Sequence, residues 1–200
     1  MAALGIATVL LMAWGGLWVA DEAGSPFAGR ALARAGSLVG IAAPDAAGLS
    51  AVAGVPIGGD FHLVDQTGTP VTEASYHGRW MLLYFGYTFC PDVCPTELQT
   101  IATALGKLGP AATAVVPIFV SVDPARDTPA VLAKYVKLFS KRLVGLTGTP
   151  AEIAEVAHAF RVYYAREPAK PGQAYAVDHS SFVYLMDPKG RLAALFNQDT

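Results

Sequence analysis

The chain has 200 residues, of which 53% are apolar and 15% are charged, and its net charge is −2. This length and apolar content suffice for one substantial hydrophobic core but hardly for two. The basic residues are scattered along the chain, which argues against a nucleic-acid-binding surface.

The first twenty residues have the properties of a membrane anchor. Residues 2–20 carry no charge, and the run is about as long as a helix that spans a bilayer. Trp14 and Trp18 lie near its end, where an interfacial aromatic belt would sit. A cleaved signal peptide is the alternative, but a basic n-region and a clean cleavage site are missing. We therefore expect a transmembrane anchor (or uncleaved signal) at 1–20, a flexible tether rich in Ala, Gly, Ser and Pro at 21–56, and an exported domain at 57–200.

From residue 57 onward the sequence predicts one α/β domain. Apolar, β-branched runs predict buried strands, and apolar positions at helical spacing after Pro or Thr predict helices. Strands are expected at 61–65, 70–72, 81–86, 115–122, 143–146, 182–186 and 192–196, and helices at 95–108, 129–139 and 150–160. Residues 163–180 are expected to be irregular. Strands that alternate with helices and end in a hairpin indicate a mixed central sheet flanked by helices.

Cys90 and Cys94 are the only cysteines of the chain, and they follow the predicted strand 81–86. Pro95 suits the first position of the next helix, so Cys94 is expected at or near the N-cap. There its sulfur would face the positive end of the helix dipole, which favours the thiolate. The spacing lets both sulfur atoms share one metal ion or close a disulfide. An inert buried pair or a purely structural disulfide is the alternative, and the position at a helix N-terminus disfavours it.

Four motifs, in the same order, resemble those of the Sco/SenC family of membrane-anchored, copper-binding proteins. They are GYTFCPDVCP at 86–95, SVDPARDT at 121–128, LVGLTG at 143–148 and VDHS at 177–180. The resemblance covers most of the expected exported domain. It implies a thioredoxin-like fold and a role in assembling the copper sites of cytochrome c oxidase.

The same resemblance implies a copper site formed by Cys90, Cys94 and His179. Taken alone, a single histidine beside an acidic residue would be interpreted as an ordinary polar group. Members of the family bind Cu(I) or Cu(II), and their metal-free cysteine pair can exist as a redox disulfide. Asp178 would then orient the imidazole or tune the site from outside the ligand set. Asp92 is either an acid that acts near the thiols or a turn residue.

Two thiolates and one imidazole suit Cu(I), tolerate Cu(II) and leave one position open for an acceptor. Zinc is the alternative metal. It would need a fourth ligand, such as Asp or another His, because structural zinc sites usually have four protein ligands. We expect the protein to deliver copper to the copper-site subunit of cytochrome c oxidase, or to keep the cysteines of that subunit reduced. A membrane-tethered thiol–disulfide oxidoreductase is the second hypothesis, and a peroxidase-like reductase the third.

Asp123, Arg126 and Asp127 follow the predicted strand 115–122, so they are expected on the same face as the cysteines. An Arg–Asp pair that braces this loop is the interpretation we favour over recognition of a partner. Besides the oxidase subunit and the membrane, the expected partners are a thiol–disulfide reductant or a copper donor protein. The abundance of Ala and Gly, without an organellar presequence, favours the inner membrane of a bacterium, with the soluble domain facing the periplasm.

Overall fold

The computed structural model describes residues 56–169, 172 and 174–197. The expected anchor at 1–20 and nearly all of the expected tether at 21–56 lie outside these residues, so both stay predictions. In the part of the chain that is described, no helix has the length and apolar character needed to cross a membrane.

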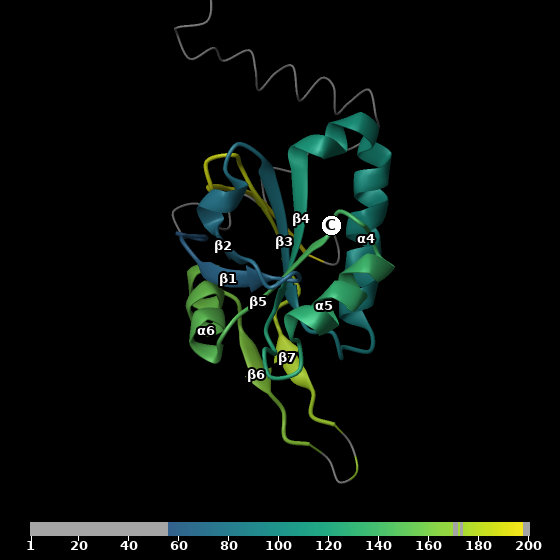
Figure 1. The fold of residues 1–200 in the computed structure, drawn as a ribbon, viewed down its shortest axis with the longest axis vertical. Helices are drawn as coiled ribbons and strands as arrows, with labels where there is room; N and C mark the ends of the chain where they lie inside the picture. Colours follow the sequence, from purple (N-terminus) through teal and green to yellow (C-terminus); the bar gives the residue numbers. More distant parts are fainter. Residues whose placement is uncertain (1–55, 170–171, 173, 198–200) are drawn as a thin grey trace, which may run out of the picture. The chain divides into compact units, whose positions relative to one another are not determined.

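A seven-stranded mixed sheet forms the centre of the described domain (Figure 1). It consists of β1 (His62–Asp65), β2 (Pro70–Thr72), β3 (Trp80–Gly86), β4 (Val115–Ser121), β5 (Val144–Thr147), β8 (Val183–Met186) and β9 (Leu192–Phe196). The strands are ordered β2-β1-β5-β4-β3-β8-β9. β3, β4 and β5 run parallel, whereas β1 and β8 pair antiparallel with β5 and β3. The predicted mixed sheet is therefore confirmed.

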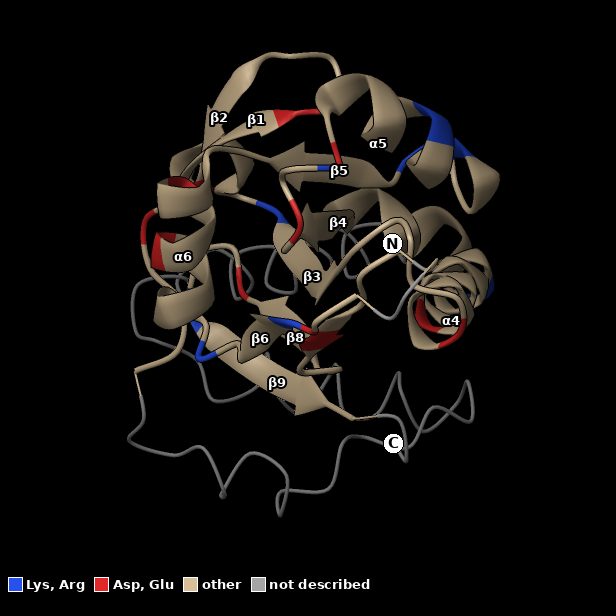
Figure 2. Ribbon diagram, turned by 90° about the horizontal axis from the view of Figure 1, so that it is seen from below, with Lys and Arg blue, Asp and Glu red and all other residues tan. Residues whose placement is uncertain are grey.

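Helices cover both faces of this sheet. Figure 2 shows α4 (Val93–Leu108) and α5 (Pro129–Tyr135) on one face and α6 (Pro150–Ala159) on the other. Three short 3-10 helices lie between these elements, namely η1 (Glu73–Tyr76), η2 (Gly109–Ala114) and η3 (Val136–Leu138). The predicted helix 129–139 is thus α-helical only in its first part and then tightens into η3.

α6 begins where the sequence predicts. The hydroxyl of Thr149 accepts a hydrogen bond from the backbone N–H of Glu152, and the Glu152 carboxylate accepts one from the backbone N–H of Thr149 at 2.6 Å. This reciprocal capping satisfies two N–H groups that the first helical turn leaves without a partner.

The two central strands, β3 and β4, form the core and also position the functional site. Their side chains include Leu83, Tyr84, Phe85, Phe119 and Val120, all fully buried. Both strands are apolar along almost their whole length because helices cover both faces. The parallel register runs from Trp80–Val115 to Gly86–Ser121. The loops that follow Gly86 and Ser121 therefore leave the sheet side by side.

A second, two-stranded sheet lies within the segment that the sequence predicts to be irregular. β6 (Tyr164–Arg166) and β7 (Val177–His179) pair antiparallel, with Tyr164 opposite His179. The prediction for 163–180 was wrong at these two strands. Strands of three residues are too short to produce a recognisable alternation of apolar and polar side chains.

Candidate metal centre

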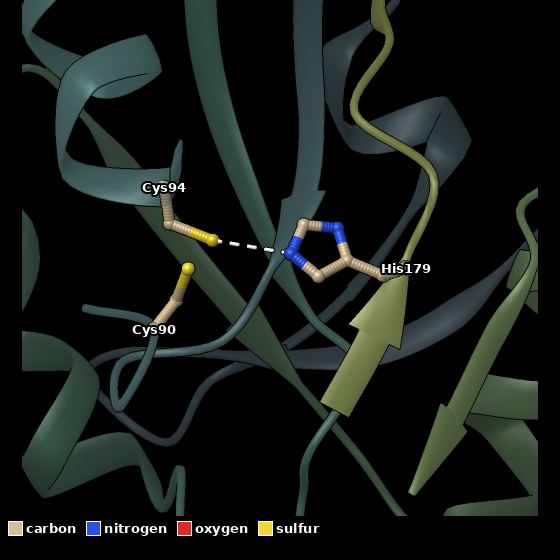
Figure 3. Close-up of side chains that lie close together, drawn as sticks. All are labelled: Cys90, Cys94 and His179. Atoms are coloured by element: carbon tan, nitrogen blue, oxygen red, sulfur yellow. Dashed lines mark hydrogen bonds between the residues drawn. The ribbon is translucent and has the colours of Figure 1, made fainter. Parts of the chain in front are cut away.

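Three potential metal ligands converge from two distant parts of the chain (Figure 3). Cys90 lies in the loop after β3, Cys94 in the first turn of α4, and His179 at the end of β7. Their ligand atoms all lie within 4.8 Å of one another. Because bonds from a metal to thiolate sulfur or imidazole nitrogen are about 2.0–2.3 Å long, one ion between them can reach all three after small adjustments.

The first turn of α4 differs slightly from the prediction. Asp92 is the N-cap and Val93 the first helical residue, so Cys94 lies within the first turn and Pro95 occupies the third position. The proline is tolerated there because the N–H groups of a first turn have no partner within the helix. Cys94 is thus near the N-cap, as expected, at the second position of the helix.

The two thiols have different environments. Cys94 is completely buried, whereas Cys90 is half-buried. The hydrogen bond from the Cys94 thiol lowers the pKa of Cys90 to about 3, against the effect of burial and with help from His179 and two backbone N–H groups. The same shared hydrogen bond, together with burial, raises the pKa of Cys94. The expectation from the helix dipole placed the thiolate on Cys94, whereas the burial of Cys94 and the directions of these two pKa shifts favour Cys90 as the charged partner of the metal-free pair.

His179 directs one ring nitrogen at the sulfur atoms. Its Nε2 lies 3.3 Å from the Sγ of Cys94, and its Nδ1 lies 3.0 Å from the backbone oxygen of Ser180. A carbonyl oxygen can only accept a hydrogen bond, so Nδ1 carries a proton. In the neutral imidazole, the lone pair of Nε2 then faces the thiols. This is the arrangement that a metal ligand needs.

The pKa of His179 results from opposing effects. Burial alone would lower this pKa, but hydrogen bonds with Cys90 and the Ser180 carbonyl, and the negative charges of Cys90 and Asp178, raise it above its usual value. Asp178 itself is exposed and lies in the middle of β7. Its charge is one cause of the raised pKa of His179, and its role in orienting the imidazole or tuning the site stays a prediction.

Asp92 contributes to the site through its backbone. Its side chain is exposed and makes no capping hydrogen bond, whereas its N–H is one of the backbone groups that stabilise the Cys90 thiolate. Of the two interpretations that the sequence left open, these contacts favour the turn residue.

Two residues of β3 form the inner wall of the site, and sequence reasoning missed both. The Tyr84 hydroxyl donates a hydrogen bond to the Sγ of Cys94 at 3.8 Å. A Cβ atom on Gly86 would lie 2.6 Å from the same sulfur, so only glycine leaves room for it. The available signal was a glycine that ends a buried strand directly before the cysteine loop, since a glycine within a strand often marks a close approach.

Residues 51–200, which contain all three candidate ligands, match the sequence profile of SCO1/SenC. The chain belongs to the SCO1/SenC family. Protein SCO1 homolog, mitochondrial, from Homo sapiens is 44% identical over 145 residues, which make up 72% of this chain and 48% of the human protein. The chain thus spans about half the length of this relative.

Solved structures of SCO1/SenC proteins have the same fold. The copper-bound structure of Bradyrhizobium japonicum ScoI is 50% identical with a TM-score of 0.67, over 70% of this chain and 89% of that chain. BsSco is 28% identical with a TM-score of 0.57, over 72% of this chain and 84% of that chain. A disulfide switch has been identified in BsSco, a member of the Sco family of cytochrome c oxidase assembly proteins. The thioredoxin-like α/β fold that the sequence resemblance implies is therefore confirmed.

Proposed function

We propose that this chain binds one copper ion through Cys90, Cys94 and His179 and delivers it to the copper-site subunit of cytochrome c oxidase. The observation that carries the proposal is the convergence of the three ligand atoms within 4.8 Å. Two thiolates and one imidazole form a soft ligand set that suits Cu(I) and tolerates Cu(II). The copper bound by the related Bradyrhizobium japonicum ScoI supports the same metal here.

The burial of the ligands suits transfer rather than permanent storage. Cys94 is enclosed by the core and by Tyr84, whereas Cys90 is partly exposed. Three protein ligands leave a coordination position that an incoming thiolate or imidazole of an acceptor can take. Exchange would therefore begin from the side of Cys90, with Cys94 as the last ligand to release the ion.

The cysteine pair also supports the second candidate, a thiol–disulfide oxidoreductase. The low pKa of Cys90 favours its attack as a thiolate on a disulfide of a partner. The pair would donate two electrons and the Cys94 proton, and water would supply the second proton, leaving the partner with two thiols and closing a Cys90–Cys94 disulfide. The oxidase subunit would thereby keep its copper-site cysteines reduced, and an external thiol–disulfide reductant would reset the pair. The disulfide switch of BsSco supports such a cycle.

We place this activity at the outer face of a bacterial inner membrane. The anchor at 1–20 would hold the domain in the periplasm through the tether at 21–56. This compartment is oxidising, so the cysteine pair can alternate between dithiol and disulfide. A copper donor protein would load the site there.

A titration of the reduced protein with Cu(I), in competition with a coloured chelator, tests the proposal. We expect a one-to-one complex in which the change of His179→Ala lowers affinity by about 100-fold or more, since even residues outside the ligand set contribute 10–100-fold. The double change of Cys90→Ser and Cys94→Ser should abolish tight binding. His158→Ala is the matched control, because His158 is exposed on α6.

One pair of results would make the oxidoreductase the better supported function. Copper affinity that is unchanged in His179→Ala, together with loss of turnover of a disulfide substrate in Cys90→Ser, would favour the oxidoreductase. Copper affinity that is insensitive to pH across the range of thiol titration would also contradict thiolate ligation, because binding must displace protons.

A further inference from the structure

The loop between β4 and α5, residues 122–128, contacts both parts of the chain that supply the proposed ligands. The sequence predicts an Arg–Asp pair that braces this loop itself. The structure adds contacts in two further directions, one toward the cysteine loop and one toward β7.

Asp127 holds the cysteine loop. Its side chain is fully buried. Oδ2 accepts hydrogen bonds from the Thr88 N–H at 2.9 Å and the Ser121 hydroxyl at 2.6 Å, and Oδ1 accepts one from the Thr88 hydroxyl at 2.6 Å. Because Thr88 precedes Cys90 by two residues, Asp127 fixes the backbone that leads to the first sulfur atom.

Arg126, the neighbouring residue, holds the segment that leads into β7. Its Nη1 donates a hydrogen bond to the backbone oxygen of Tyr175 at 2.9 Å, and its Cζ lies 3.7 Å from the centre of the Tyr175 ring. Its Nε pairs with the buried carboxylate of Asp123. The Tyr175 hydroxyl donates to the same carboxylate at 2.8 Å. These three residues, the Arg126 cluster, therefore bond to one another. Arg166 of β6 joins them from outside, donating to the Tyr175 hydroxyl at 3.3 Å and pairing with Asp123 at 3.9 Å.

The Arg126 cluster holds an element that has little support of its own. β6 and β7 form a separate sheet of two three-residue strands. Such a pair is at best marginally stable alone. The backbone N–H of Val177, which donates to the Tyr87 hydroxyl, and the pairing of Arg166 with Asp123 add further attachments. Tyr175 lies two residues before β7, and His179 ends it, so contacts at Tyr175 hold the start of the segment that carries the imidazole.

We infer that Arg126 is a positioning residue, which holds His179 beside Cys90 and Cys94 through its contacts with Tyr175. The inference rests on the proposed function, because it concerns the geometry of the proposed copper ligands. With Arg126 in place, copper meets a ligand set that is already arranged, and binding does not have to order the β6–β7 pair. Without Arg126, Asp127 still fixes the cysteine loop, but the imidazole loses its position relative to the sulfur atoms.

The surroundings of Arg126 favour this internal role over recognition of a partner. Only 22% of its side chain is exposed. The guanidinium group lies over the Tyr175 ring and 4.9 Å from the centre of the Phe89 ring. Phe89 is 58% exposed, so an approaching partner would meet this ring before the arginine.

A double-mutant cycle between Arg126 and His179 tests the inference. We expect Arg126→Ala to weaken Cu(II) binding by about tenfold or more and to remove the imidazole nitrogen coupling from the electron paramagnetic resonance spectrum. In a His179→Ala background, the same change should alter affinity by less than about twofold, because no imidazole remains to be positioned. Arg142→Ala is the matched control, since Arg142 also donates to backbone oxygens, those of Ala112 and Val115, but outside the site.

Two results would overturn the inference. Equal losses of affinity with and without His179 would mean that Arg126 acts on the cysteines or on general stability. Full affinity combined with failed transfer to the oxidase subunit would assign Arg126 to partner recognition. If Arg126→Ala does not fold, Tyr175→Phe removes only the hydroxyl that binds Asp123. This milder variant should weaken the nitrogen coupling, and an unchanged spectrum would overturn the inference equally.

A measurement without copper separates this inference from the proposed function. The His179 ring lies 5.8 Å from the Tyr87 ring and 6.3 Å from the Tyr84 ring, between centroids. NMR cross-peaks between these rings therefore report the position of the imidazole in the metal-free protein. Their loss in Arg126→Ala, but not in Arg142→Ala, supports the inference. If the cross-peaks are retained in Arg126→Ala, the inference about Arg126 is overturned and the copper proposal is unaffected. If the wild-type protein binds no copper, only the copper proposal is overturned.

Discussion

The Nε2 atom of His179 lies 3.3 Å from the sulfur of Cys94, although 85 residues separate them in the chain. Cys94 is fixed by the first turn of α4, and His179 by the pairing of β7 with β6. Neither element alone forms the ligand set, so the complete set exists only in the folded protein. Metal binding and folding are therefore coupled.

This coupling predicts that copper stabilises the protein. At a free Cu(I) concentration of 100 times the dissociation constant, the free energy of unfolding should rise by about 2.7 kcal/mol. The midpoint of thermal unfolding should rise by roughly 5–15 °C, and a strong chelator should reverse the shift. Calorimetry of the reduced protein measures both effects. The variant with both Cys90→Ser and Cys94→Ser should show no shift, and an equal shift in this variant would contradict the assigned ligands.

Enlarging Gly86 should disturb both packing and metal binding. In Gly86→Ala, the new Cβ would lie 2.6 Å from the Cys94 sulfur, so β3 or α4 must move. We expect a loss of about 1–3 kcal/mol in the free energy of unfolding, as for other overpacked cores, together with weaker Cu(I) binding. Urea denaturation and chelator competition measure these two quantities.

Gly106→Ala provides the control for this change, because Gly106 is exposed on α4 and nothing lies within 4 Å of its added Cβ. It should stabilise the helix by about 0.5–1 kcal/mol and leave copper affinity unchanged. Equal behaviour of the two alanine variants would show that the space around Cys94 does not limit the site.

The unequal pKa values of the cysteines predict selective alkylation of the reduced, metal-free protein. Because the Cys94 thiol lowers the pKa of Cys90 to about 3, iodoacetamide should modify Cys90 at a nearly constant rate between about pH 5 and about pH 8. An ordinary thiol would react roughly tenfold faster per pH unit over this range. Cys94, whose pKa is raised, should react slowly. Peptide mass spectrometry identifies the modified residue, and preferential labelling of Cys94 would contradict the assignment.

The same pKa values determine how stability depends on pH. The pKa of Cys90 is depressed on folding, so its contribution is complete above the ordinary value of 9.0 and is lost as pH falls toward about 3. The contribution of Cys94 has the opposite sign, being complete below 9.0 and lost at higher pH. Cys90 should therefore make the free energy of unfolding rise with pH. In Cys90→Ser, this contribution to the rise should be absent. Urea denaturation at a series of pH values tests this, and an unchanged slope would count against it.

Asp127→Asn should destabilise the protein by about 2–3 kcal/mol, because it replaces a buried charged acceptor of three hydrogen bonds with a neutral amide. Asp65→Asn is the control, since Asp65 also accepts three hydrogen bonds, from Thr67 and Thr69, but in the turn between β1 and β2. It should cost less than about 1 kcal/mol. Comparable losses in urea denaturation would mean that burial adds nothing to the contribution of Asp127.

The sequence was most informative where local rules decide the structure. β3 was predicted within one residue of its observed bounds, and the capping box at Thr149 marks the start of α6. The contacts that assemble the site are not local, since Thr88 and Asp127 are 39 residues apart, and Arg126 and Tyr175 are 49 apart. Propensity and periodicity carry no signal for such pairs.

The ligand identities, in contrast, came from the resemblance to a family, because a lone histidine has no distinguishing pattern. The charge on Cys90 could not be predicted in the same way. It depends on a hydrogen bond between two thiols whose relative burial only the folded structure determines.

The alignment of β7 against β6 has a consequence for the choice of cation. His179 lies opposite Tyr164, and Asp178 opposite Ala165. Since successive residues of a strand point to opposite faces, a slip of one residue would turn a carboxylate toward the sulfur atoms in place of the ring. Carboxylates suit harder ions such as Mg²⁺ or Mn²⁺. The two thiolates would keep their preference for a soft ion. The identity of the third ligand, however, depends on how two three-residue strands line up, and an insertion between Tyr164 and Arg166 would alter it without changing the sequence of β7.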